Sequence, residues 1–136
     1  MLNRILSHRS LDTDLASLFL RIIIGGLFVY HGAMKVDSYD KILPMFKDVI
    51  GIGSKLSFNL VIFAELGCGF LVLIGFFTRL TIIPIFITML VAFFIAHEAD
   101  VFGKKVLPLV YLLSCIPVFI LGSGKYSVDR LITKKE

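Results

Sequence analysis

Four long stretches of apolar residues, each interrupted by few charges, dominate the pattern along this chain. Each has roughly the 17–25 residues that an α-helix needs to cross the hydrocarbon core of a bilayer. Backbone N–H and C=O groups cannot stay unpaired in lipid. An α-helix pairs them within a single segment, whereas a β-strand would need a closed barrel. The pattern therefore predicts four membrane-spanning helices, at about residues 15–35, 57–77, 80–97 and 106–122.

The one long connection, residues 36–56, mixes charged with apolar side chains. That spacing suits a short amphipathic helix lying on the membrane surface. We expect it to begin near Ser38 and to end at Gly51 and Gly53, with Pro44 accommodated in its first turn or at a kink. The predicted fold class is thus all-α: a polytopic membrane four-helix bundle with a short interfacial amphipathic helix between the first two spans, in a single domain over residues 1–136.

Composition argues against the two competing explanations of these stretches. The mean hydropathy is +0.93 and only 18% of residues are charged, against about 25% in soluble proteins. A soluble bundle would need a polar face on each helix, which these stretches lack. A secretory signal is also disfavoured, because the first stretch contains Arg21, has no small-x-small cleavage site after it and precedes three more spans.

The formal net charge of +4 comes from basic residues around the spans. They form no basic stripe with interleaved aromatics, so we expect the lipid bilayer as a partner and no nucleic acid. Four spans place both ends of the chain on one side, which carries slightly more basic residues than the other. By the positive-inside rule the termini are predicted to be cytoplasmic, in a multi-pass protein of a bacterial inner (plasma) membrane. The basic residues on that side are Arg4, Arg9, Arg79, Lys125, Arg130, Lys134 and Lys135.

Several ionisable residues lie within the apolar stretches, where they are the strongest candidates for a functional site. Arg21, His31 and Lys35 share one face of the first span, and Glu65 lies deep in the second. A charged group in a membrane span is costly and is retained mainly where it faces the bundle interior, a partner or a water-filled cavity. Gly25 and Gly32 lie on or beside the same face, so another helix or a flat ligand could approach it closely.

Helical rise places Glu65 at a depth between His31 and Arg21, which leaves two interpretations open. In the first, Arg21 and Glu65 form a structural ion pair that fixes the helix register. In the second, a polar cavity opens on the side of His31, Lys35 and His97 and takes a small anion or a quinone head group. His31 and Glu65 could then exchange protons.

Neither a metal nor a cofactor is encoded by a motif. His31, His97 and Glu65 are scattered in the sequence and make a weak case as metal ligands, so no metal is expected. Cys68 and Cys115 are isolated inside apolar spans with no C-x-x-C between them. We expect them to be small packing residues and not a redox pair.

Three short blocks match motifs in the order and spacing of a known family. The first, with the pattern R-x-x-x-G…H-G-x-x-K, covers residues 21–35; the second runs from Glu65-Leu66-Gly67-Cys68-Gly69 to Gly75-Phe76-Phe77-Thr78-Arg79; the third, G-x-G-x-x-S-x-D, covers residues 122–129. Together they resemble the DoxX family of small four-helix bacterial membrane proteins, over about residues 17 to 130. Many members carry an acidic residue near the start of the fourth helix, where this chain has Lys104-Lys105-Val106-Leu107-Pro108.

The resemblance implies a link to membrane redox chemistry. Members are associated with membrane redox complexes, including the small subunit of thiosulfate:quinone oxidoreductase, and with tolerance of oxidative or quinone stress. Our leading hypothesis is a subunit or accessory of a quinone-linked redox system, with quinone as the implied ligand and a redox subunit as the implied partner. Whether the chain is itself an enzyme, and its oligomeric state, stay open. The cavity would be lined by Arg21, His31, Lys35, Glu65 and His97, with Arg79, Lys125 and Asp129 tying the cytoplasmic ends together.

Two other functions remain as alternatives. In the first, the chain is a non-catalytic membrane scaffold whose buried ion pair orders the bundle or docks a partner subunit. The second, a small permease, would need a continuous polar route across the bilayer. It ranks last, because the cytoplasmic halves of the second to fourth spans are too apolar.

Overall fold

The computed structural model describes Ser7 and residues 10–133, and in this part of the chain all regular structure is helical. Arg4, Arg9, Lys134 and Lys135, counted above for the orientation of the spans, lie outside the described residues. The elements in chain order are α2 (Thr13–Asp37), α3 (Tyr39–Ile42), η1 (Leu43–Met45), α4 (Ser54–Ile62), η2 (Phe63–Cys68), α5 (Gly69–Ile74), α6 (Thr78–Val91), η3 (Ala92–Ala96), α7 (Phe102–Leu121) and α8 (Val128–Thr133).

The prediction of four membrane-spanning helices is confirmed within the described residues. Four continuous helical stretches are long and apolar enough to cross a bilayer: Thr13–Asp37, Ser54–Ile74, Thr78–Ala96 and Phe102–Leu121. The second is built from α4, η2 and α5, and the third from α6 and η3. The first span begins slightly before the predicted start, because the side chain of Asp12 accepts a hydrogen bond from the backbone N–H of Leu15 at 3.0 Å and caps the helix.

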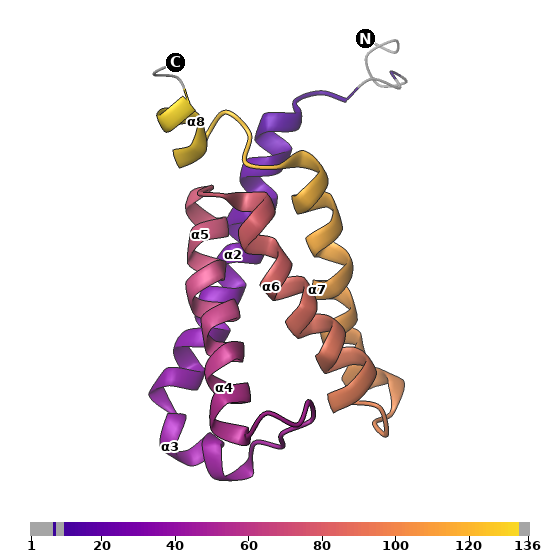
Figure 1. Ribbon diagram of the computed structural model, residues 1–136. Coiled ribbons are helices and arrows are strands. Elements are labelled where there is room, and N and C mark those ends of the chain that lie inside the picture. Colours follow the sequence, from indigo (N-terminus) through magenta and orange to yellow (C-terminus); the bar gives the residue numbers. More distant parts are fainter. Residues whose placement is uncertain (1–6, 8–9, 134–136) are drawn as a thin grey trace.

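The spans form a bundle in which α2 packs closely on the second span (Figure 1). A Cβ added at Gly32 would lie 2.5 Å from the backbone nitrogen of Leu66, and one added at Gly25 would lie 2.7 Å from that of Leu73. No larger side chain fits at these crossings, so the two glycines allow another helix to approach, as their positions suggested. The buried core consists of Ile24, Phe28, Cys68, Val72, Ile82, Ile85, Met89, Tyr111, Leu112, Cys115 and Val118.

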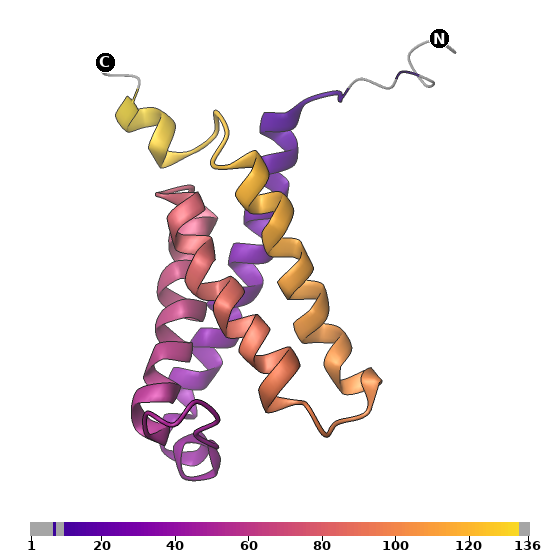
Figure 2. The same ribbon diagram turned by 45° about the vertical axis from the view of Figure 1, so that its right-hand side comes forward.

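The bundle is closed at one end and splayed at the other. Figures 1 and 2 both show α5 and α6 close together near the end that carries α8, and α4 and α6 diverging toward the end that carries α3. The N-terminal end of α2 and the short α8 lie at the closed end. The connections between the first two spans and between the last two lie at the splayed end.

The predicted interfacial helix is shorter than expected. Helical structure runs through α3 and the 3-10 turn η1, and it stops at Met45 instead of Gly51. Pro44 lies in the 3-10 turn, where its missing N–H and its ring geometry do not allow a regular α-helix to continue. Residues 46–53 instead form a loop that Asp48 holds closed through hydrogen bonds described below.

Candidate functional site

Glu65 occupies an unusual backbone position near the middle of the second span. It lies in η2, a π-helical segment between two α-helical ones, and only 5% of the residue is exposed. Short π-helical segments are rare and often occur at functional sites, because the wider turn changes the direction of a side chain within a continuous helix. The sequence contains no signal from which this turn could be predicted.

The carboxylate of Glu65 pairs with a cation from the first span. The ammonium nitrogen of Lys35 lies 2.5 Å from Glu65 Oε2, and the side chains are 27% and 6% exposed respectively. Lys35 is near the end of α2, so its long side chain turns back along the helix to reach the carboxylate. A buried charge is thereby compensated within the bundle, as the apolar setting requires.

The predicted ion pair between Arg21 and Glu65 is therefore wrong, and Arg21 does not line the cavity described below. Arg21 lies about 21 Å along the helix from Lys35, toward the closed end. Its guanidinium is buried and donates to two backbone carbonyls, that of Leu73 at 3.2 Å and that of Tyr126 at 2.5 Å. Arg21 thus ties the end of the second span to the C-terminal segment.

His31 meets a residue that the sequence analysis did not single out. Its Nε2 atom and the hydroxyl of Tyr111, on α7, are 3.2 Å apart and share a hydrogen bond whose direction depends on the histidine tautomer. The ring of Tyr111 is buried and packs against Phe28, with ring centroids 4.9 Å apart. A tyrosine inside an apolar span is an amphipathic residue in need of a hydrogen-bond partner, and that need was the signal available in the sequence.

These side chains lie around a cavity of about 460 Å³ at the splayed end of the bundle. Its walls come from α2, from α4 and η2, from α6 and η3, and from α7, and the loop after η1 contributes as well. Polar atoms come from His31, Lys35, Glu65, His97 and Tyr111, and most of the remaining lining is apolar. The further lining residues are Phe28, Phe46, Lys47, Val49, Ile50, Ser57, Leu60, Val61, Ile87, Thr88, Met89, Val91, Ala92, Ala96, Leu107 and Pro108.

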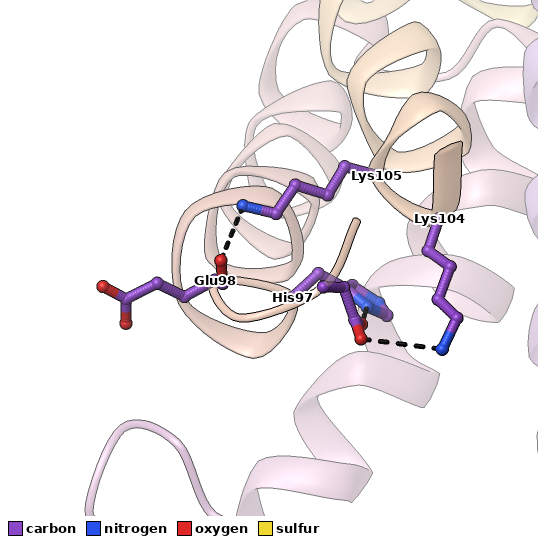
Figure 3. Close-up of polar contacts among 5 residues, drawn as sticks. His97, Glu98, Lys104 and Lys105 are labelled. Atoms are coloured by element: carbon purple, nitrogen blue, oxygen red, sulfur yellow. Dashed lines mark hydrogen bonds and ion pairs between the residues drawn. The ribbon is translucent and has the colours of Figure 1, made fainter. Parts of the chain in front are cut away.

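His97 lies at the rim of this cavity, in the connection between α6 and α7. Its Nδ1 atom is 2.7 Å from Asp100 Oδ2, and the ammonium of Lys104 is 3.7 Å from the other oxygen of that carboxylate. Both contacts lower the pKa of Asp100, the hydrogen bond from His97 most strongly. Lys105 turns the opposite way and donates to the carbonyl of Glu98 at 3.0 Å (Figure 3). These bonds give the connection a defined shape without filling the cavity.

The residues expected to tie the ends of the spans make such contacts at the closed end. Arg79, on α6, donates to the carbonyl of Phe119 at 3.1 Å, close to the end of α7. Asp129 accepts from the backbone N–H of Phe77 at 2.9 Å. Lys125 places its backbone N–H 2.9 Å from Asp14 Oδ1 and its ammonium 3.7 Å from Asp12 Oδ2.

No group of three His, Cys, Asp or Glu residues close enough to hold a metal ion is found in the described part of the chain. His31 hydrogen-bonds to Tyr111 and His97 to Asp100, so each imidazole has a different partner. Cys68 and Cys115 are both free thiols buried in the apolar core, where they act as small packing residues.

Comparisons with known proteins agree with this architecture. The DoxX family model matches residues 16–98, which include the first three spans. The chain is 31% identical to the inner membrane protein YqjF of Escherichia coli, over 90% of this chain and 95% of that protein. It is 28% identical to the uncharacterized membrane protein Rv3486 of Mycobacterium tuberculosis, over 85% of this chain and 80% of that protein. No solved structure gives a significant match.

Proposed function

The chain belongs to the DoxX family of membrane proteins, and from that premise we propose that it binds a quinone head group as a subunit or accessory of a membrane redox system. The observation that carries the proposal is the cavity of about 460 Å³, whose mostly apolar walls surround a few polar groups. Small-molecule sites are typically cavities of about 300–1,000 Å³ with this division between apolar walls and orienting polar atoms.

The polar groups of the cavity match the needs of a quinone. A quinone is a flat, neutral ring with carbonyl oxygens that accept hydrogen bonds. Lys35 is a donor, and Tyr111 becomes one toward a ligand when Nε2 of His31 carries its hydrogen and donates to the phenolic oxygen. Phe28 and Tyr111 supply aromatic surface against which such a ring can pack.

The charges of the cavity favour this neutral head group over the small anion considered above. The ammonium of Lys35 is already balanced by the carboxylate of Glu65, deep in the cavity. An anion placed beside Glu65 would meet like charge where dielectric screening is low, at a cost that a neutral ring avoids.

Binding of a soluble short-chain quinone to the purified protein in detergent tests the proposal. We expect saturable binding to wild type, and a loss of affinity of about tenfold or more in His31→Ala and in Glu65→Gln, because each variant removes or releases a polar group of the cavity. Tyr30→Phe is a matched control, since Tyr30 adjoins His31 in sequence, is 60% exposed and does not line the cavity. If both cavity variants bind quinone as wild type does, the proposal is wrong.

A second candidate function is a scaffold in which the same ion pair serves the fold. The pair of Lys35 and Glu65 joins the first span to the second, where Gly32 already holds the two backbones close. As a scaffold, the protein would lose thermal stability or complex assembly in Glu65→Gln while its affinity for quinone, if any, stayed unchanged. The same variant therefore separates the two functions.

We further propose that the protein lies in the inner membrane with cytoplasmic termini. The small excess of basic residues that the sequence predicts for the side of the termini supports this orientation. The cavity and the loop 46–53 would then lie toward the periplasm. Green fluorescent protein fused after Thr133 should fluoresce, whereas alkaline phosphatase fused at the same point should be inactive. A dark fluorescent-protein fusion together with an active phosphatase fusion would show that the termini are periplasmic.

A further inference from the structure

The lining of the cavity includes exposed side chains from two helices on the side of the bundle. Leu60 on α4 and Ile87 on α6 both line it and are 48% and 54% exposed, so both side chains lie at its accessible edge. They come from the two helices that diverge toward the splayed end in Figures 1 and 2. One accessible edge of the cavity therefore lies in the gap between α4 and α6, and Ile50 and Leu107, which also line it and are 46% and 52% exposed, lie at its other edges.

This gap lies at the level of the hydrocarbon. Leu60 is about 9 Å along the helix from Ser54, where the second span begins, and Ile87 is about 14 Å from Ala96, where the third span ends. The hydrocarbon core of a bilayer is about 30 Å thick, so both positions fall within it. The surface around the gap is therefore covered by acyl chains and not by water.

The loop 46–53 lines the cavity at its aqueous end. Phe46, Val49 and Ile50 line the cavity from that side. The loop is fixed by Asp48, which accepts hydrogen bonds from Gly51 N at 3.0 Å, Gly53 N at 2.5 Å and Ser57 Oγ at 2.9 Å.

A ring contact fixes the start of the same loop. The rings of Phe46 and Phe58 pack with centroids 4.9 Å apart, and Phe58 is fully buried in α4. Residues at both the beginning and the middle of the loop are therefore anchored to α4, which holds the loop against the cavity.

We infer that the ligand reaches the cavity from the bilayer, between α4 and α6, and carries an apolar chain that remains in this gap while its polar head reaches Lys35, Glu65 and Tyr111. The inference rests on the proposed function for the head group. It adds that the physiological ligand is a membrane-dissolved amphiphile, since a water-soluble molecule would have to pass the anchored loop.

Affinity measurements with two quinones test this route. The protein is reconstituted in lipid nanodiscs and titrated with a benzoquinone that carries a ten-carbon chain and with the same ring without the chain. In Leu60→Trp and Ile87→Trp, which place a bulky side chain in the gap, we expect the affinity for the chained quinone to fall about tenfold or more. The affinity for the chainless ring should fall by less, because its polar partners Lys35, Glu65 and Tyr111 are unchanged.

Leu56→Trp and Leu90→Trp are matched controls. These leucines lie on the same two helices, are 53% and 38% exposed, and do not line the cavity. We expect wild-type affinity for both quinones in both variants. Retained binding of the chainless ring in the gap variants also shows that those variants are folded.

Asp48→Ala gives a second and independent measurement. Because it releases the loop without altering the gap, it should leave the binding rate of the chained quinone unchanged. Faster binding of that quinone in Asp48→Ala, or equal affinities in the gap and control variants, would overturn the lateral route. Failure of wild type to bind either quinone would instead overturn the proposed function, and the lateral route with it.

Discussion

The ammonium of Lys35 and the carboxylate of Glu65 meet at 2.5 Å, although the first lies near the end of its span and the second near the middle of the next. The contact depends on a lysine side chain long enough to turn back along α2 and on a π-helical turn at Glu65. It places opposite charges beside each other in a cavity whose walls are mostly apolar.

The two partners of this ion pair should contribute unequally to stability. Lys35→Met leaves the 6% exposed carboxylate without a cation, and we expect it to lower the free energy of unfolding by about 3–5 kcal/mol. Glu65→Gln should lower the free energy of unfolding by less, because the 27% exposed side chain of Lys35 can extend to the aqueous surface. The double variant should be more stable than the sum of the two losses implies. Denaturation in sodium dodecyl sulfate, followed by circular dichroism, measures all three values, and simple additivity would show that the pair is not coupled.

Gly26 and Gly32, six residues apart on α2, should respond oppositely to alanine. Gly32→Ala should destabilise the bundle by about 1–3 kcal/mol, because the new Cβ would lie 2.5 Å from the backbone nitrogen of Leu66. Gly26→Ala is the matched control: nothing lies within 4 Å of its Cβ position, so alanine should be neutral or stabilise the helix by up to about 1 kcal/mol. Equal effects in thermal unfolding would contradict the close packing of the first two spans.

The loop over the cavity should open at acid pH. The pKa of Asp48 is lowered from its usual 3.8, mainly by the hydrogen bond from the backbone N–H of Gly53. A lowered pKa means that the carboxylate stabilises the closed loop above about pH 3.8 and that this contribution is lost as the pH falls through the folded-state pKa.

Asp48→Ala should remove this dependence. Hydrogen exchange at the amides of Gly51 and Gly53, corrected for the intrinsic effect of pH, should be several times faster in the variant than in wild type at pH 6. The two proteins should converge below the folded-state pKa of Asp48. If exchange at pH 6 is the same in both, Asp48 does not hold the loop.

Removing the Tyr111 hydroxyl should weaken quinone binding with little effect on the fold. In Tyr111→Phe the ring can still pack on Phe28. His31 loses its hydrogen-bond partner, and the ligand loses a hydrogen-bond donor. We expect the affinity to fall by roughly fivefold to a hundredfold, corresponding to about 1–3 kcal/mol. Isothermal titration measures it, with Tyr30→Phe as control. Unchanged affinity would remove Tyr111 from the site.

Most of the architecture could be predicted from the sequence, because the bilayer imposes a simple requirement. Long apolar stretches must form helices in lipid, and the four spans are found where this requirement places them, with end shifts of a few residues. The closeness of the first two spans could also be expected, since Gly25 and Gly32 leave room for another backbone.

The partners of the charged residues could not be predicted in the same way. Depth along a helix placed Glu65 between His31 and Arg21, but it takes no account of how far a lysine side chain can turn back. Arg21 binds backbone carbonyls of Leu73 and Tyr126, and every residue has such a carbonyl, so the sequence carries no sign of them. The loop 46–53 was mistaken for helix because its hydrophobic spacing hid the role of Asp48 as a cap for three donors.

A crystal structure of the protein grown from a lipidic phase with the chained quinone is the sharpest test of quinone binding in the cavity. We expect density for a flat ring beside Tyr111 and the pair of Lys35 and Glu65, with the chain leaving between Leu60 and Ile87. A cavity occupied only by acyl chains or by repacked side chains, with the quinone absent from it at saturating concentration, would show that the cavity is not a quinone site.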